Sequence, residues 1–186
     1  MPIAVLMPAM ALAYLTLALV TFGQRKPGYS HVVHTISELG EVGAPDARAV
    51  AWLVFFPVGL LQLLVAGLHF ASTPLVALVA VCLGAGYVVA AVFPCDPGSP
   101  VSGSVRQGIH NLGGGVEYVC GGLGFLKAAG QFGAAFEVLG YAILVVAVAL
   151  TVFPQTSVRG LVQRVGELGL FGGLSALVWI SAGSSF

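Results

Sequence analysis

Long apolar runs alternate with short polar stretches along the whole chain. Each run has close to the roughly 20 residues that a helix needs to cross the hydrocarbon core of a bilayer. The expected membrane-spanning helices cover residues 3–22, 51–70, 75–93, 108–126, 134–153 and 158–181. The pattern therefore predicts an all-α, polytopic membrane bundle of six transmembrane helices, with residues 1–186 as a single transmembrane domain.

The composition agrees with the bilayer as the solvent of this chain. Hydrophobic residues make up 58% of the sequence and charged residues only 8%, against about 25% charged residues in an average protein. The formal net charge is zero and no basic run is present, which excludes nucleic acid as an expected partner. The expected partner is a membrane lipid or another hydrophobic small molecule, and the sequence leaves the oligomeric state open.

The positive charges predict an orientation. Six of the seven Lys and Arg residues flank connections 23–50, 94–107 and 154–157, and the seventh is Lys127. The six are Arg25, Lys26, Arg48, Arg106, Arg159 and Arg164. Because cytoplasmic loops carry an excess of Lys and Arg, these three connections are expected in the cytoplasm. Both termini are then expected outside, in a multi-pass protein of the plasma membrane.

The same side of the membrane is expected to hold most of the ionisable and polar side chains. Unpaired charge at membrane depth is costly, so these groups should face one another or a wet cavity. Asp96 is the candidate general acid, with Glu38 and His110 as base or orienting partners. The candidate substrate-binding residues are Ser37, His31, His34, Asn111 and Glu117. Ser37 or Glu38 is expected within hydrogen-bond reach of Asp96 or His110.

Two of these clusters have alternative interpretations. If residues 31–38 are helical, His31, His34 and Glu38 share a face, which suits a metal site with Asp96 and His110 as further ligands, or an interfacial helix. Zinc sites of this kind carry denser His or Cys motifs, so we expect neither a metal nor a cofactor. Asp96 precedes Pro97, a pattern typical of a helix N-cap followed by proline.

The helices themselves carry further signals. His110 and Glu117 are seven residues apart, so both should lie on one helix face and be satisfied inside the bundle. Glu167 is expected to pair with Arg164 or Gln163 on its own helix. Glycines 113, 114 and 121 are expected at close helix contacts, where Gly114→Leu would lower stability.

Several short motifs resemble one family of membrane proteins. They are Tyr29-Ser-His31, Thr35-Ile-Ser-Glu-Leu-Gly40, Phe93-Pro-Cys-Asp-Pro-Gly98 and Ile109-His-Asn111. They resemble the signature of domain of unknown function 998, a prokaryotic family of integral membrane proteins. The resemblance implies a six-helix bundle and supplies no activity.

Two broader resemblances suggest chemistry. Membrane hydrolases of the alkaline ceramidase and adiponectin-receptor type also combine Ser, Asp and His around zinc near one leaflet, but their paired histidines on the last helix are absent here. Small membrane terpene cyclases use carboxylic acids in an apolar pocket, parts that Glu38, Asp96 and Glu117 could play because burial keeps an acid protonated. We therefore expect an enzyme of acid–base chemistry, by cyclisation, isomerisation or hydrolysis, on a lipid-like or isoprenoid-like molecule. The alternative is a non-enzymatic carrier or binding scaffold.

Overall fold

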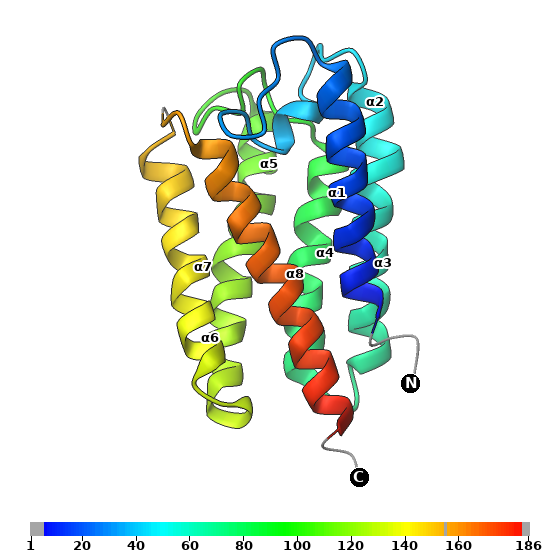
Figure 1. The fold of residues 1–186 in the computed structure, drawn as a ribbon, viewed down its shortest axis with the longest axis vertical. Coiled ribbons are helices and arrows are strands. Elements are labelled where there is room, and N and C mark those ends of the chain that lie inside the picture. The colour runs from blue at the N-terminus through cyan, green and yellow to red at the C-terminus, as the bar shows by residue number, and fades with distance from the viewer. Residues whose placement is uncertain (1–5, 155, 184–186) are drawn as a thin grey trace.

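The computed structural model describes residues 6–154 and 156–183, and these residues form helices and connections without a strand. Figure 1 shows an elongated bundle in which α1 (Met7–Arg25) begins, and α8 (Arg159–Gly183) ends, at the same end. We call the opposite end the polar end; connections 26–46 and 93–104 and residues 153–154 and 156–158 meet there. The predicted all-α membrane bundle is confirmed.

Between α1 and α8 lie four further crossings of the bundle. The second consists of α2 (Ala47–Ala49), the π-helical turn η3 (Val50–Phe55) and α3 (Phe56–His69). The third is α4 (Pro74–Val92) and the fifth is α7 (Ala135–Val152). The fourth consists of α5 (Val105–Gly115), the π-helical turn η4 (Val116–Cys120) and α6 (Gly121–Phe132). All six predicted spans are present; residues 3–5 of the first lie outside the described residues.

Five of the six crossings are long and apolar enough to span a membrane. The fourth is less apolar, because polar side chains gather in its first half, at Arg106, Gln107, His110, Asn111 and Glu117. The protein is thus a multi-pass membrane protein whose fourth crossing carries several polar groups.

Local sequence signals set the helix ends. Pro74 occupies the first position of α4, where its missing N–H leaves no donor unsatisfied. The Ser104 side chain accepts a hydrogen bond from the Gln107 N–H and starts α5. Gly133, with φ of 106°, ends α6 in a backbone conformation that favours glycine. The predicted start near residue 108 is therefore three residues late. The interpretation of Asp96 as a helix N-cap is wrong, because residues 96–104 are not helical and Ser104 caps α5.

Glycines let several helices approach closely. A Cβ on Gly59 of α3 would lie 2.9 Å from the Gly84 carbonyl oxygen of α4, and one on Gly140 of α7 would lie 2.8 Å from the Gly122 oxygen of α6. Gly113 and Gly121 likewise face close neighbours, Val89 and Leu170. Close backbone approach of this kind holds membrane helices together.

Gly114 departs from this pattern. A Cβ built on Gly114 would meet no atom within 4 Å, and Gly114 lines a cavity rather than a helix contact. Gly114 was expected at a close helix contact, and this prediction is wrong. A larger side chain at this position would enter open space, so Gly114→Leu is not expected to destabilise the bundle by overpacking.

Candidate functional site

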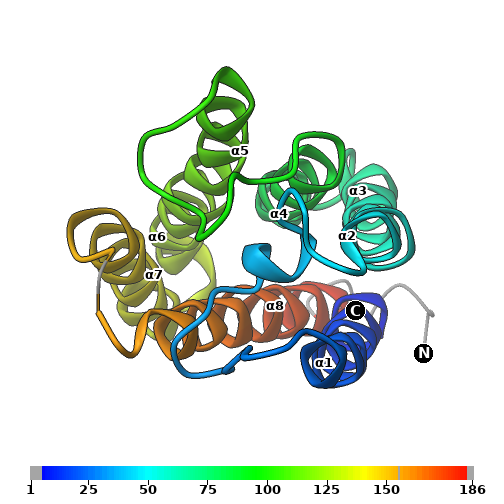
Figure 2. The ribbon, with the colours of Figure 1, turned by 90° about the horizontal axis from the view of Figure 1, so that it is seen from above.

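A cavity of about 300 Å³ lies between the fourth crossing, α7, α8 and the connections at the polar end. Figure 2, a view from above, shows that α5 and α7 stand apart there, with residues 30–40 passing beside α8. We call this space the main cavity. Its lining residues are Thr35, Ser37, Ser99, Val101, His110, Asn111, Gly114, Gly115, Tyr118, Val119, Ala147, Val148, Leu150, Thr151, Arg159 and Gln163.

The segment that carries Ser37 is fastened to the first turns of α8. The N–H groups of Gly160 and Leu161 donate to the carbonyl oxygens of Val33 and Val32, at 3.2 and 2.9 Å. Gln163 Oε1 accepts a 2.7 Å hydrogen bond from the Ile36 N–H. These contacts satisfy donors that a helix N-terminus would otherwise leave open, and they fix the segment immediately before Ser37.

The short 3-10 helix η2 (Ser37–Gly40) is fixed by two further contacts. Glu38 Oε1 accepts hydrogen bonds from the N–H and the hydroxyl of Thr35, at 2.8 and 3.0 Å. The Cys95 thiol donates to the Ser37 carbonyl oxygen at 3.3 Å, and burial raises the pKa of this thiol to about 12. Cys95 is thus a neutral, structural donor that positions Ser37.

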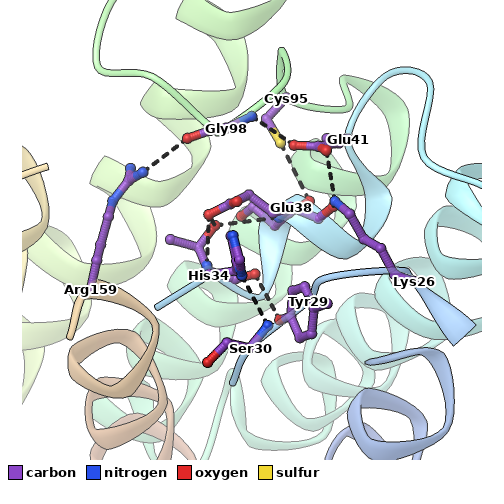
Figure 3. A network of polar contacts seen from close by, with 11 residues as sticks. Lys26, Tyr29, Ser30, His34, Glu38, Glu41, Cys95, Gly98 and Arg159 are labelled. Carbon is purple, nitrogen blue, oxygen red and sulfur yellow. Dashed lines mark hydrogen bonds and ion pairs between the residues drawn. The ribbon is translucent and has the colours of Figure 1, made fainter. Parts of the chain in front are cut away.

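A chain of polar contacts joins the three connections at the polar end (Figure 3). Lys26 pairs with Glu41 at 2.6 Å, and Glu41 Oε2 accepts from the Gly98 N–H at 2.7 Å. Arg159 then donates to the carbonyl oxygens of Gly98 and Ser99, at 3.0 and 2.6 Å. The chain holds residues 98–99 against the main cavity and orients Arg159 beside it.

Ser37 and His110 form a hydrogen-bonded pair in the wall of the main cavity. Ser37 Oγ lies 3.1 Å from His110 Nε2, and His110 Nδ1 lies 2.9 Å from the Phe93 carbonyl oxygen. A carbonyl oxygen only accepts, so Nδ1 carries the ring proton and Nε2 of the neutral imidazole accepts from the serine hydroxyl. The prediction that Ser37 or Glu38 lies within hydrogen-bond reach of Asp96 or His110 is confirmed, through Ser37 and His110.

Asp96 lies outside the main cavity. Its carboxylate accepts from the N–H and hydroxyl of Ser104, both at 2.8 Å, and pairs with Arg106 at 2.6 Å. The Ser104 N–H, the Arg106 side chain and the Ser104 hydroxyl hold the pKa of Asp96 below its ordinary value. This environment suits a carboxylate that organises the loop before α5.

His31, His34 and Glu38 do not share a helical face, because residues 31–36 form turns. His34 Nδ1 accepts from the Ser30 N–H at 2.9 Å, whereas His31 Nδ1 lies 3.0 Å from Arg164. Burial and Arg164 lower the pKa of His31, so it accepts from the guanidinium. The expected shared face is wrong, and no three His, Cys, Asp or Glu side chains of the described residues are grouped as metal ligands.

The other candidate substrate-binding residues, Asn111, His31 and His34, do not share one cavity. Asn111 lines the main cavity, where its side-chain N–H groups hold the carbonyl oxygens of Pro100 and Val101 at 3.2 and 2.8 Å. His31 instead lines a second cavity of about 360 Å³, which is mostly apolar and lies between α1 and α8. His34 lines neither cavity.

Glu117 and Glu167 meet inside the bundle, where they form a carboxyl cluster with Tyr87 and Tyr118. Glu167 accepts hydrogen bonds from the hydroxyls of Tyr118 and Tyr87, at 2.6 and 2.8 Å. Glu117 is hydrogen-bonded to Glu167, and its Oε1 is buried without a partner among the described residues. Because two carboxylates in contact repel each other strongly in an apolar interior, one of the pair must carry a proton.

The expected intrahelical partners of Glu167 are wrong. Arg164 donates instead to the Tyr29 hydroxyl at 2.6 Å and to the His34 carbonyl oxygen at 3.0 Å. His110 and Glu117 are both buried, as predicted, and both face α4: His110 contacts Phe93 at its end, and Glu117 lies against Gly86.

Sequence reasoning did not assign a site role to Tyr118, Arg159 or Gln163, which all line the main cavity. One available signal was spacing: Arg159 and Gln163 are four residues apart and share a face of α8. Tyr118 had no such signal, because a tyrosine in an apolar helix is ordinarily part of the core.

Comparison with known proteins places the whole chain in one family. No curated protein and no solved structure matches it. The model of the family described as protein of unknown function (DUF998) matches residues 8–180. That match includes residues of all six crossings as well as Ser37 and His110, and the chain therefore belongs to the DUF998 family.

Proposed function

We propose that the protein is a membrane enzyme that performs acid–base chemistry on a lipid-like molecule held in the main cavity. The observation that carries the proposal is the pair of Ser37 Oγ and His110 Nε2, 3.1 Å apart, with His110 Nδ1 bound to a carbonyl oxygen. This is the arrangement in which a histidine can take the proton of a serine nucleophile. Of cyclisation, isomerisation and hydrolysis, it favours hydrolysis or acyl transfer.

The proposed reaction uses the two residues in succession. The Ser37 oxygen attacks the carbonyl carbon of an ester or amide while its proton passes to His110 Nε2. His110 then gives that proton to the leaving oxygen or nitrogen, and an acyl-serine remains. Water, or an alcohol in the transfer reaction, attacks the acyl group with His110 again as base, which restores the Ser37 hydroxyl.

Asp96 and Glu38 receive supporting roles in this proposal. Asp96 is held by Ser104 and Arg106 outside the cavity, and Glu38 is held by Thr35. Asp96 shapes the loop that leads into α5, and Glu38 shapes the turn that presents Ser37. The cytoplasmic location of this end of the bundle, inferred from six of the seven Lys and Arg residues, is part of the proposal.

A fluorophosphonate that carries an alkyl chain tests the proposed nucleophile, because it reacts covalently with an activated serine. Purified protein in detergent should gain one adduct by intact mass. Ser37→Ala should abolish labelling, and His110→Gln should slow it by at least about 100-fold, the lower range of general-base catalysis. Ser102→Ala, at an exposed serine of the same end, is the matched control and should label like the parent. Labelling that persists in Ser37→Ala, or no labelling of the parent, would reject the proposal.

The carboxyl cluster favours one alternative, a proton-coupled carrier. Tyr118 lines the main cavity and Glu167 lines the second cavity, so their 2.6 Å hydrogen bond lies between the two spaces. Ionisable groups at this depth commonly bind protons in transporters. A carrier would lose lipid movement in Glu167→Gln and keep it in Ser37→Ala, whereas the enzyme would lose turnover in Ser37→Ala.

A further inference from the structure

The lining of the main cavity is asymmetric in charge. Among the residues that the structure describes, no Asp or Glu lines it, and Arg159 is the one permanently charged lining residue. The ion pairs found among residues 6–154 and 156–183 are Arg25–Asp46, Lys26–Glu41 and Arg106–Asp96. Arg159 thus lines the cavity without a direct carboxylate partner, and binds only carbonyl oxygens, those of Gly98 and Ser99.

The nearby acid does not cancel this charge inside the cavity. Glu38 attracts Arg159 electrostatically. However, Glu38 does not line the cavity, and its Oε1 is occupied by the N–H and hydroxyl of Thr35. The guanidinium of Arg159 therefore lines the cavity, whereas the carboxylate of Glu38 that attracts it does not.

Gln163 adds a second donor beside Arg159. The two residues are four positions apart on α8 and both line the cavity. Gln163 Oε1 is used by the Ile36 N–H, and the Gln163 side chain is also hydrogen-bonded to Tyr118, another lining residue. An amide NH₂ carries two N–H groups, so a second N–H can serve a ligand. A guanidinium and an amide N–H group on one helix face form a donor set that suits phosphate or carboxylate oxygens.

Another part of the cavity wall is apolar. Val119 of the fourth crossing and Ala147, Val148 and Leu150 of α7 form this wall. Val119 and Val148 are also solvent-exposed, at 41% and 55%, as expected of side chains near the lipid-facing surface. The outer surface at this depth contacts lipid in a membrane-spanning bundle, so a hydrocarbon chain can lie along this wall and reach the bilayer.

We infer that the main cavity binds an amphiphile with an anionic headgroup, the headgroup at Arg159 and Gln163 and the tail between the fourth crossing and α7. This inference names the substrate class of the proposed enzyme and rests on that proposed function for its role. The ester or amide to be cleaved would then lie next to the anionic group, within the same polar half of the cavity as Ser37 and His110.

The test is a binding measurement in neutral detergent with three probes: dodecyl phosphate, dodecanol and inorganic phosphate. It uses the full chain with Ser37→Ala, so that binding is measured without turnover. Dodecyl phosphate should raise the melting temperature of the protein and should bind saturably in a titration. Dodecanol and inorganic phosphate should bind at least about tenfold more weakly, because the loss of one charge-assisted hydrogen bond has an effect of this size.

Charge variants complete the test. Arg159→Gln should weaken dodecyl phosphate binding by about tenfold or more, and Arg159→Lys should retain most of it because the charge remains. Arg159→Lys keeps the positive charge but cannot donate to the carbonyl oxygens of Gly98 and Ser99 from two nitrogen atoms at once. Comparison of the two variants therefore distinguishes the effect of the charge from the effect of the contact with the loop. Arg48→Gln removes an exposed arginine of the same end and should bind like the parent.

Three results would overturn the inference: equal affinity for dodecanol, binding in Arg159→Gln like that of the parent, or inorganic phosphate bound as tightly as dodecyl phosphate. The last would identify a free anion as the ligand. Because binding is measured in Ser37→Ala, a failure of the serine chemistry leaves this result unchanged, and the two proposals fail independently.

Discussion

At the scale of single residues, the proposed chemistry depends on which ring nitrogen of His110 carries the proton. The Phe93 carbonyl oxygen sets the tautomer of His110, and His110 in turn orients the Ser37 hydroxyl. The backbone takes the place that a carboxylate holds in a Ser–His–Asp triad. Ser99, which also lines the cavity, has a φ of 46°, a left-handed conformation that non-glycine residues rarely adopt. Strained residues of this kind are common at functional sites.

Asp96 gives a residue-scale prediction of pH dependence. Its pKa in the folded protein lies below its ordinary value because the Ser104 N–H, the Arg106 side chain and the Ser104 hydroxyl bind the carboxylate. Its stabilising contribution is therefore fully present above the pKa of the unfolded chain and is lost as the pH falls through the lower pKa of the folded protein. The melting temperature of Asp96→Asn should fall below that of the parent at neutral pH, and the difference should shrink as the pH drops below about 4.

Thermal unfolding in detergent across this pH range measures the difference. Ser104→Ala keeps the carboxylate and removes one donor, so it should show the same pH trend with a smaller amplitude. A difference between parent and Asp96→Asn that does not change with pH would contradict the assigned role.

At the scale of elements, α8 is the scaffold of the site. Its first turns hold residues 32–36 through Gly160, Leu161 and Gln163, and Arg159 and Gln163 face the cavity. The fourth crossing contributes the opposite wall, and its π-helical turn η4 carries Glu117 and Tyr118. Such turns often occur at functional sites, and here the turn includes both an acid and a phenol of the carboxyl cluster.

Gly160 tests the attachment of the polar segment to α8. A Cβ at Gly160 would overlap the carbonyl group of His34 and approach the His31 carbonyl oxygen. Gly160→Ala must push the segment away, and should destabilise the protein by about 1–3 kcal/mol, the usual cost of overpacking. It should also slow fluorophosphonate labelling of Ser37, because the displaced segment carries the proposed nucleophile.

Gly172→Ala is the control on the same helix, since a Cβ at Gly172 meets no atom within 4 Å. It should leave stability unchanged or raise it by roughly 0.5–1 kcal/mol, because alanine is the better helix former. Equal melting temperatures and labelling rates for the two variants would mean that the segment moves freely away from α8.

At the scale of the whole molecule, both cavities and the carboxyl cluster of Glu117 and Glu167 belong to the half of the bundle that includes the polar end. An even number of crossings brings the start of α1 and the end of α8 to the same end, and all three connections of the polar end to the other (Figure 1). The proposed amphiphile would then have its headgroup at the polar end, near water.

The topology prediction concerns this arrangement. Single cysteines placed at exposed positions 48 and 102 of the polar end should be protected from an impermeant maleimide added to intact cells, and should react after lysis. A cysteine at exposed position 131, at the other end, should react in intact cells. These labelling experiments start from a background in which Cys82, Cys95 and Cys120 are replaced by serine or alanine. The opposite labelling pattern would invert the orientation and move the proposed site to the outer leaflet.

The sequence by itself determined the number of crossings and the family signature. Hydrophobic length is a local property, and runs such as 75–93 need no partner to be recognised as membrane helices. The sequence also predicted that Ser37 or Glu38 would lie within hydrogen-bond reach of Asp96 or His110, because ionisable groups in an apolar chain must find partners. Ser37 and His110 confirm that prediction.

Only the tertiary structure decided which polar groups meet. The chain folds residues 31–36 as turns that bind α8, so His31, His34 and Glu38 separate instead of sharing a helical face. Glu167 takes its hydrogen bonds from Tyr87 and Tyr118 on two other crossings, partners that no spacing within α8 could indicate. Gly114 faces a cavity while its neighbour Gly113 packs on Val89, because one residue along a helix turns the side chain by about 100°. The length of a hydrophobic run is a local property of the sequence. The partner of a buried polar atom depends instead on how separate helices are placed around that atom.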